Sequence, residues 1–318
     1  MTSTTTALAL NTPDSDHLRF LPEGPYPLAE NKLSWVGIQH GPDASNGSLN
    51  VLDLASGSNQ SFDLPGRPGF AFPCQSDGKF VVGCERTLGI FDTADSSWSP
   101  FCEGIDDDVT NTIINDGMVH DGNLIFGTKD LEFATKKAGL YLWRGADQKL
   151  IRLRDDQICS NGKAIRIHDG DLQLIDIDSP TREVAGYTID IAAGTLGERK
   201  VLLDLTNDPA VPDGAILTPD KTGLIVSMFL PEQAGDGQTR LYDLQSGELK
   251  HIWHMPGSPQ NTCPALVPSG GKLKLVVTTA IEHMSDEVKR ESPNAGQLFV
   301  ADTDLENPGN ELDPRFSM

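Results

Sequence analysis

Six short apolar segments recur along this chain, and the starts of successive segments lie 45, 44, 48, 52 and 51 residues apart. Each is rich in the large apolar and β-branched residues that favour strands. The six segments are Trp35–Ile38, Phe80–Gly83, Leu124–Gly127, Leu172–Ile175, Leu224–Ser227 and Leu275–Thr278. A nearly constant period of this length is typical of repeat architectures in which each repeat is one small unit of secondary structure.

Further strand-like segments accompany each member of this series. Some follow a segment of the series, as Leu88–Asp92 and Leu140–Trp143 do, and others precede one, as Gly69–Phe72 and Cys263–Val267 do. Leu244–Leu249 has the composition of a hairpin turn. Six units with four short strands each predict an all-β fold, a six-bladed β-propeller with four antiparallel strands per blade. A pair of β-sandwiches would not explain the even period, and no segment sustains the 3.6-residue periodicity of a helical repeat.

The prediction covers residues 17–318 as a single propeller domain and leaves residues 1–16, which are rich in Ser and Thr, as a flexible N-terminal segment. Ile281–Arg290 is the best candidate for a helix, within a long connection of the sixth unit. The acidic tail, Asp302–Met318, is expected to supply the outer strand that closes the fold, together with residues 17–21.

The composition of the chain indicates which kinds of molecule it is expected to bind. The chain has 318 residues and a formal net charge of −21, which disfavours binding to nucleic acid because the phosphate backbone is also negative. Five cysteines without paired spacing resemble neither a disulfide framework nor a zinc site. With no signal peptide or membrane-spanning run, we expect a cytoplasmic protein, a monomer or homodimer that acts on a small molecule.

Four short motifs place a carboxylate or carboxamide beside a glycine. They are Glu23-Gly24-Pro25, Asn115-Asp116-Gly117, Ser160-Asn161-Gly162 and Pro212-Asp213-Gly214. Each alone is an ordinary turn former. Their polar residues are separated by 92, 46 and 52 residues, so they recur at one phase of the repeat with one unit skipped. If the repeats close into a ring, residues of equal phase meet near its axis, and we expect these four side chains to converge there.

Carboxylate and amide oxygens are hard ligands, so a site made of them suits one divalent cation. Calcium is the first expectation for this site, and Mg²⁺, Mn²⁺, Zn²⁺ and Fe²⁺ are also compatible. Fewer than six protein ligands would leave room for water and substrate. A cation held in this way polarises a carbonyl or phosphoryl oxygen and lowers the pKa of bound water.

The same motifs resemble the senescence-marker-protein, gluconolactonase and luciferin-regenerating-enzyme family, typified by regucalcin. The resemblance spans nearly the whole chain, and its segments occur in the order of that family. They are Leu21–Ile38, Asn115–Thr128, Ser160–Ile165, Asp178–Val201, Val211–Gly214 and Asn294–Val300. The resemblance implies a six-bladed propeller with one divalent ion. It also implies that Glu23, Asn161 and Asp213 are metal ligands, that Asn115 is a fourth ligand or a substrate-positioning amide, and that Asp213 is a general acid or base.

Three further positions bear on the substrate. Glu132 falls near a position that contacts substrate in some members of the family. Ile113 stands where the sugar-lactone members carry arginine, so this chain is expected to accept a more apolar lactone or ester. Phe72, in the second unit, is expected to make the mouth of the site less polar.

These expectations together favour a metal-dependent lactonase, a carboxylic ester hydrolase that opens a cyclic ester with metal-activated water. Two alternatives remain open at this point. One is a phosphotriester or fluorophosphate hydrolase that uses the same metal site, and the other is a non-catalytic calcium-binding propeller.

Overall fold

The computed structural model describes residues 2–231, 233–309 and 314–317. These residues form two compact units. One comprises Met1–Arg67 with Pro209–Asp313, and the other comprises Pro68–Asp208 with Pro314–Met318. Part of the tail predicted to close the fold, residues 310–313 and 318, lies outside the described residues. None of the helices in the described parts of the chain is long and apolar enough to cross a membrane.

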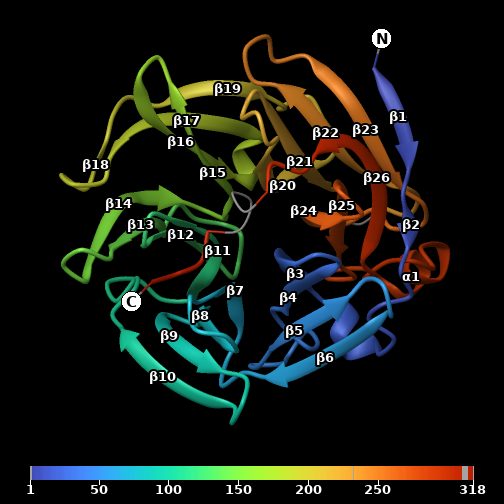
Figure 1. Cartoon of the computed structure of the whole chain (residues 1–318), viewed down its shortest axis with the longest axis horizontal. Helices are drawn as coiled ribbons and strands as arrows, with labels where there is room; N and C mark the ends of the chain where they lie inside the picture. The colour runs from blue at the N-terminus through green and yellow to red at the C-terminus, as the bar shows by residue number, and fades with distance from the viewer. Residues whose placement is uncertain (1, 232, 310–313, 318) are drawn as a thin grey trace. The chain divides into compact units, whose positions relative to one another are not determined.

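Six antiparallel sheets follow one another along the chain (Figure 1), and three of them belong to the second unit. The second sheet has β7 Pro68–Pro73, β8 Lys79–Cys84, β9 Thr87–Asp92 and β10 Ser97–Cys102. The third has β11 Thr112–His120, β12 Asn123–Asp130, β13 Ala138–Arg144 and β14 Lys149–Gln157. The fourth has β15 Ser160–His168, β16 Asp171–Asp178, β17 Glu183–Asp190, β18 Thr195–Leu196 and β19 Lys200–Asp204.

The first, fifth and sixth sheets belong to the other unit. The first sheet has β3 Pro22–Ala29, β4 Lys32–Gly37, β5 Ser48–Asp53 and β6 Ser58–Asp63. The fifth has β20 Val211–Leu217, β21 Gly223–Phe229, β22 Gly237–Asp243 and β23 Leu249–Met255, with β1 Ser3–Thr6 added at its edge. The sixth has β24 Asn261–Ser269, β25 Lys272–Thr279, β26 Phe299–Glu306 and β2 Leu8–Ala9. The fold class is the six-bladed β-propeller that the sequence predicts.

Burial differs between the first and fourth strands of a sheet, as the second sheet shows most clearly. In the second sheet the first strand, β7, is buried along its whole length, whereas the fourth strand, β10, has no buried residue. Strands buried on both faces are continuous apolar runs, which explains why the sequence marks the first two strands of each repeat most clearly.

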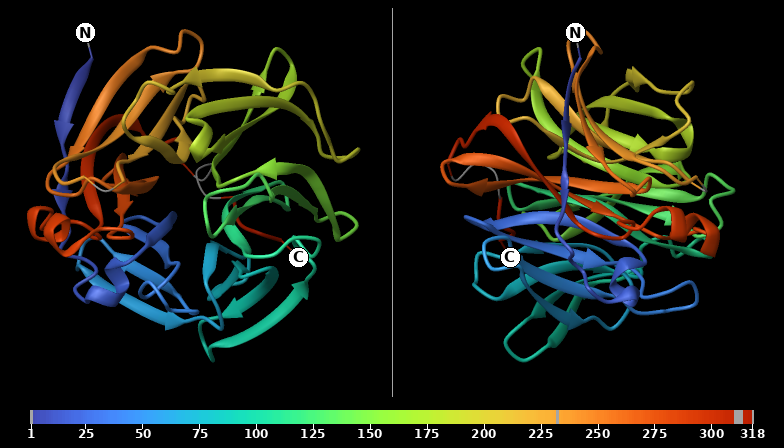
Figure 2. Two further views of the ribbon diagram at one scale, coloured as in Figure 1. Left: turned by 180° about the vertical axis from the view of Figure 1, so that it is seen from behind. Right: turned by 90° about the vertical axis from the view of Figure 1, so that its right-hand side faces the viewer.

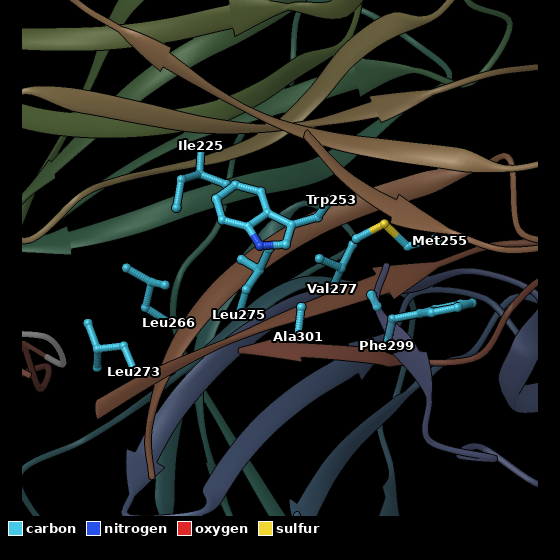
Figure 3. Close-up of a cluster of buried hydrophobic side chains, with 10 residues drawn as sticks. Ile225, Trp253, Met255, Leu266, Leu273, Leu275, Val277, Phe299 and Ala301 are labelled. Carbon is cyan, nitrogen blue, oxygen red and sulfur yellow. The ribbon is translucent and has the colours of Figure 1, made fainter. Parts of the chain in front are cut away.

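Apolar side chains from neighbouring sheets pack together between the sheets. Figure 3 shows one such cluster, where Trp253 of β23 lies near Leu275 and Val277 of β25. A second cluster joins the third and fourth sheets, with Ile125 of β12 and Leu174 of β16 both fully buried. Each full burial of such a side chain stabilises the fold by about 2 kcal/mol.

The N-terminal segment differs from the flexible chain expected for residues 1–16. Strand β1 pairs in parallel with β23, and β2 pairs with β26, so that the N-terminal segment runs beside the fifth and sixth sheets (Figure 2). The fourth strand of the sixth sheet is therefore Leu8–Ala9 rather than the C-terminal tail. The threonines of β1 are β-branched and suit an edge strand.

The helix expected at Ile281–Arg290 is shorter than that range. Helix α1 spans Asp286–Glu291, and its N-cap Ser285 accepts a hydrogen bond from the backbone of Val288. Two short 3-10 helices, η1 Asp16–Arg19 and η2 Ser179–Thr181, complete the helical elements of the described residues.

Candidate functional site

The four polar motifs lie inside the first strand of their sheets, not in turns between strands as their composition suggested. The register of each first strand on its second strand shifts at the motif, between Glu23 and Tyr26, Ile114 and Gly117, Asn161 and Ala164, and Pro212 and Ala215. Such β-bulges place extra residues in one strand and redirect side chains, and they are common next to active sites. The common phase inferred from the spacing holds to within one residue: Glu23 and Asn161 are the last paired residues before the shift, and Asn115 and Asp213 are the first residues inside it.

The sixth sheet has a shift of the same kind, and the second sheet has a shorter one. In the sixth sheet the shift lies between Asn261 and Pro264, so that the amide of Asn261 holds the register that Glu23 and Asn161 hold in their sheets. In the second sheet the shift brackets Gly69, which has no side chain. Five of the six sheets therefore carry an acidic or amide residue at the shift, and the second sheet carries none.

Within the second unit, the bulges of the third and fourth sheets bring Asn115 and Asn161 into contact. Nδ2 of Asn115 donates a hydrogen bond to Oδ1 of Asn161 at 2.7 Å and another to the backbone oxygen of Ser160 at 3.0 Å. The two asparagines are only 4% and 5% exposed. Two predicted ligands that lie 46 residues apart in the sequence therefore form one buried pair.

The orientation of both amides is fixed by their hydrogen bonds. Nδ2 of Asn161 donates to Oγ of Ser179 at 2.9 Å and lies 3.4 Å from Sγ of Cys159. Because the amide nitrogens of both asparagines donate within the protein, the carbonyl oxygen of each is the atom that can bind a cation. Oδ1 of Asn161 accepts one hydrogen bond and keeps a second lone pair for that purpose.

A buried ion pair adjoins the backbone of Asn161. Nζ of Lys163 is 3.6 Å from a carboxylate oxygen of Asp176 and donates to the backbone oxygen of Asn161 at 3.1 Å. Burial raises the pKa of Asp176 and of Asp116, and the Lys163 ammonium opposes the rise for both carboxyls. This network ties the backbone of Asn161 to a buried carboxylate through Lys163.

In the other unit, the first and fifth sheets carry the two carboxylates of the predicted set. Glu23 on β3 and Asp213 on β20 are 9% and 7% exposed. Gly24 has a φ of +52° and Gly162 one of +31°, a left-handed conformation that glycine adopts without strain and that follows the predicted ligand in each case. Oγ1 of Thr262 donates to the backbone oxygen of Pro22 at 2.7 Å, which ties the sixth sheet to the strand that carries Glu23.

The three predicted substrate positions lie in different surroundings. Ile113 is buried on β11, on the strand that carries Asn115. Glu132 is exposed on the β12–β13 loop, and its carboxylate lies 3.6 Å from Nζ of Lys137. Phe72 lies beyond the bulge position of β7, and its ring stacks on that of Phe70 with centroids 4.9 Å apart.

Sequence reasoning missed the residues that hold the asparagines. Ser179 and Cys159 contact Asn161, and Lys163 with Asp176 supports it. Cys159 is adjacent to the Ser160-Asn161-Gly162 motif and could have been considered with it. Ser179 is at the start of η2, after β16, and no local pattern links it to Asn161.

The donor set fits a divalent cation in chemical terms, since it offers two carboxylates and two oriented amide oxygens. Among the described residues, no three His, Cys, Asp or Glu side chains gather closely enough to hold a metal.

Comparisons with known proteins place these features in a family. A sequence model described as the SMP-30/Gluconolactonase/LRE-like region matches residues 21–281. A Bacillus subtilis protein, YvrE, provisionally named a sugar lactone lactonase, is 31% identical over 57% of this chain and 58% of its own length. Regucalcin of Xenopus laevis is 22% identical over 71% of this chain and 73% of its own length. The match to YvrE covers less than two thirds of that relative.

Solved structures show the same fold. A calcium-binding regucalcin from Agrobacterium tumefaciens superposes with a TM-score of 0.81 and 22% identity, over 100% of both chains. A gluconolactonase from Xanthomonas campestris gives a TM-score of 0.66 and 15% identity, over 92% of this chain and 88% of that one. The fold agrees over the full length, and the matched region contains all four bulges. This chain belongs to the SMP-30/gluconolactonase/LRE-like family.

Proposed function

We propose that this protein is a divalent-metal-dependent lactonase that opens a cyclic ester by hydrolysis. The observation that carries the proposal is that Glu23, Asn115, Asn161 and Asp213 all lie at the start of the register shift in the first strand of their sheets, with the two amides already oriented by the surrounding chain. A purely structural bulge does not require an acid or amide at that position, as Gly69 of the second sheet shows.

In this proposal Glu23, Asn161 and Asp213 hold the cation, and Asn115 is either a fourth ligand or a donor to substrate. When bound, a divalent cation supplies a Lewis acid for the ester carbonyl and lowers the pKa of bound water. Calcium is our first expectation, because one fold relative is described as a calcium-binding protein.

The protein's own residues would handle protons and position. The Asp213 carboxylate accepts the proton of the attacking water and returns it to the ring oxygen as the ester bond breaks, which gives a hydroxy acid. Asn115 holds the substrate or a ligand in place, and its own position is fixed by Asn161 and Ser160. Positioning of this kind lowers the barrier because the reacting groups are ordered before the reaction.

The substrate class is proposed from the relatives. YvrE is named for sugar lactones and the Xanthomonas protein for gluconolactone, so a small lactone is the first substrate to test. Action as a cytoplasmic monomer or homodimer and the grouping of residues 17–318 into one domain remain predictions.

The test is hydrolysis of a panel of aldonolactones by the purified protein, with and without a chelator, and by Asp213→Ala. We expect turnover that is lost on chelation, restored by adding back calcium, manganese or zinc, and absent in the variant. Full activity after chelation and in Asp213→Ala would refute the proposal. Tight calcium binding without turnover would instead identify a non-catalytic calcium-binding propeller, and preferential cleavage of paraoxon would identify a phosphotriester hydrolase.

A further inference from the structure

Lys129 is a buried cation beside the asparagine pair that no part of the proposed reaction uses. It lies on β12, and its side chain is only 5% exposed. Its ammonium group lies near the ring of Phe133, whose centroid is 5.9 Å from Nζ. Partial burial of an ammonium group away from an anion costs free energy, and a ring face compensates only part of that cost.

The register of the strands places Lys129 next to the candidate site. Lys129 is directly opposite Ile113 on β11, and on its other side it forms an isolated bridge with Cys159. Asn115 follows Ile113 by two positions, inside the register shift of β11. Sγ of Cys159 lies 3.8 Å from Nδ2 of Asn115 and 3.4 Å from Nδ2 of Asn161. Lys129 is therefore flanked on both sides by residues that lie close to the asparagine pair.

The loop that follows Lys129 is firmly built. Oδ2 of Asp130 accepts hydrogen bonds from the backbone of Ala134 and Thr135 at 3.1 and 2.9 Å, and Oδ1 lies 3.0 Å from Nζ of Lys137. Asp130 itself is fully buried. These contacts fix the β12–β13 loop so that Phe133, which is 40% exposed, stays beside the Lys129 ammonium.

Three other cations of this unit already have ion-pair partners. Lys137 pairs with Asp130 and Lys163 with Asp176, while Arg154 pairs with Asp156. Lys129 is therefore the buried cation of the asparagine region that is best placed to receive an anion from outside the protein. An overall charge of −21 repels anions at long range, so an anionic ligand needs such a local cation.

We propose that Lys129 determines specificity by binding the carboxylate of an anionic lactone while the asparagine pair faces the ester, with Phe133 against the ring. This inference rests on the proposed lactonase function and extends it to a substrate class, lactones that carry an acid group. In this proposal the positive charge that an arginine at position 113 would supply comes instead from Lys129, which lies opposite Ile113 on the neighbouring strand.

The test compares two lactones that differ at one carbon. D-glucaro-1,4-lactone carries a carboxylate where D-glucono-1,4-lactone carries a hydroxymethyl group. We expect the wild-type protein to prefer the anionic lactone. In Lys129→Met the KM for that lactone should rise about ten- to a hundredfold, with kcat and the KM for the neutral lactone little changed. Lys136→Met is the matched control, since it removes the same charge from an exposed position of the same loop and should alter neither KM.

A binding experiment separates this inference from the proposed reaction. Calorimetric titration with D-glucarate and D-gluconate needs no turnover, and thermal melting of each variant confirms that it is folded. We expect glucarate to bind the wild-type protein more tightly than gluconate and to lose that advantage in Lys129→Met alone. Equal effects of the substitution on the dianion glucarate and the monoanion gluconate, no effect on either, or no glucarate binding by the wild-type protein would overturn the role of Lys129, whether or not lactones are hydrolysed.

Discussion

The bulges of the two units carry chemically different residues among the proposed ligands, and the two kinds are held in different ways. In the second unit, Asn115 and Asn161 are neutral amides whose nitrogens donate to Ser160, Ser179 and each other. In the other unit, Glu23 and Asp213 are carboxylates. An amide can present its nitrogen or its oxygen to a cation, so it must be oriented by its neighbours, whereas either oxygen of a carboxylate will serve. The comparison suggests that the amides depend on supporting residues and the carboxylates contribute charge.

The largest effect should come from removing that charge. Asp213→Asn and Glu23→Gln preserve shape but should each weaken metal binding by about 100-fold or more, since even indirect partners of metal ligands cost 10- to 100-fold. Calorimetric titration with calcium measures the change. If either variant loses no more calcium affinity than Asn115→Ala does, the carboxylates do not contribute more to metal binding than the amides, and the proposed difference between the two units is wrong.

A buried carboxylate of the second unit provides a test in which stability is measured. Asp130→Asn should lower the free energy of unfolding by about 2 kcal/mol at neutral pH, because the carboxylate accepts several hydrogen bonds in the β12–β13 loop. Burial alone would raise the pKa of Asp130, but the Lys137 contact and the backbone donors outweigh it and hold that pKa below its ordinary value.

The pH dependence follows from that direction. A depressed pKa in the folded state stabilises the protein above the unfolded-state pKa, about 3.9, and the stabilisation is lost as the pH falls toward the folded-state pKa. Urea unfolding of the wild-type protein and Asp130→Asn should therefore differ by a constant amount from about pH 7 to 5, and the two should converge in stronger acid. A difference that grows on acidification would contradict this assignment.

The smallest of these effects concerns the support of an amide. Ser179→Ala removes the acceptor for Nδ2 of Asn161, and we expect about a tenfold loss of metal affinity with an unchanged melting temperature for the metal-free protein. Ser179→Thr keeps a hydroxyl group and should retain most of the affinity. If both variants bind calcium as the wild-type protein does, the orientation of Asn161 does not depend on Ser179.

The sequence was sufficient to predict the fold and the common phase of the four motifs, because strands buried on both faces produce long apolar runs at a regular interval. It was misleading about local conformation, since Asn-Gly and Asp-Gly suit both turns and bulges. Lys129 and Ser179 could not be predicted. Lys129 lies opposite Ile113 because β11 pairs with β12 in that register. Ser179 contacts Asn161 because β16 runs antiparallel to β15 and ends beside the start of β15. The closing strand, Leu8–Ala9, is too short to leave a pattern.

The central claim is that residues from four bulges bind one cation. A crystal structure of the protein grown with calcium, with the ion identified by its anomalous signal, tests it most directly. The account predicts one ion per chain with oxygen atoms of Glu23, Asn161 and Asp213 among its ligands and Asn115 beside it. An ion bound elsewhere, or these residues without an ion at saturating calcium, manganese and zinc, would contradict it.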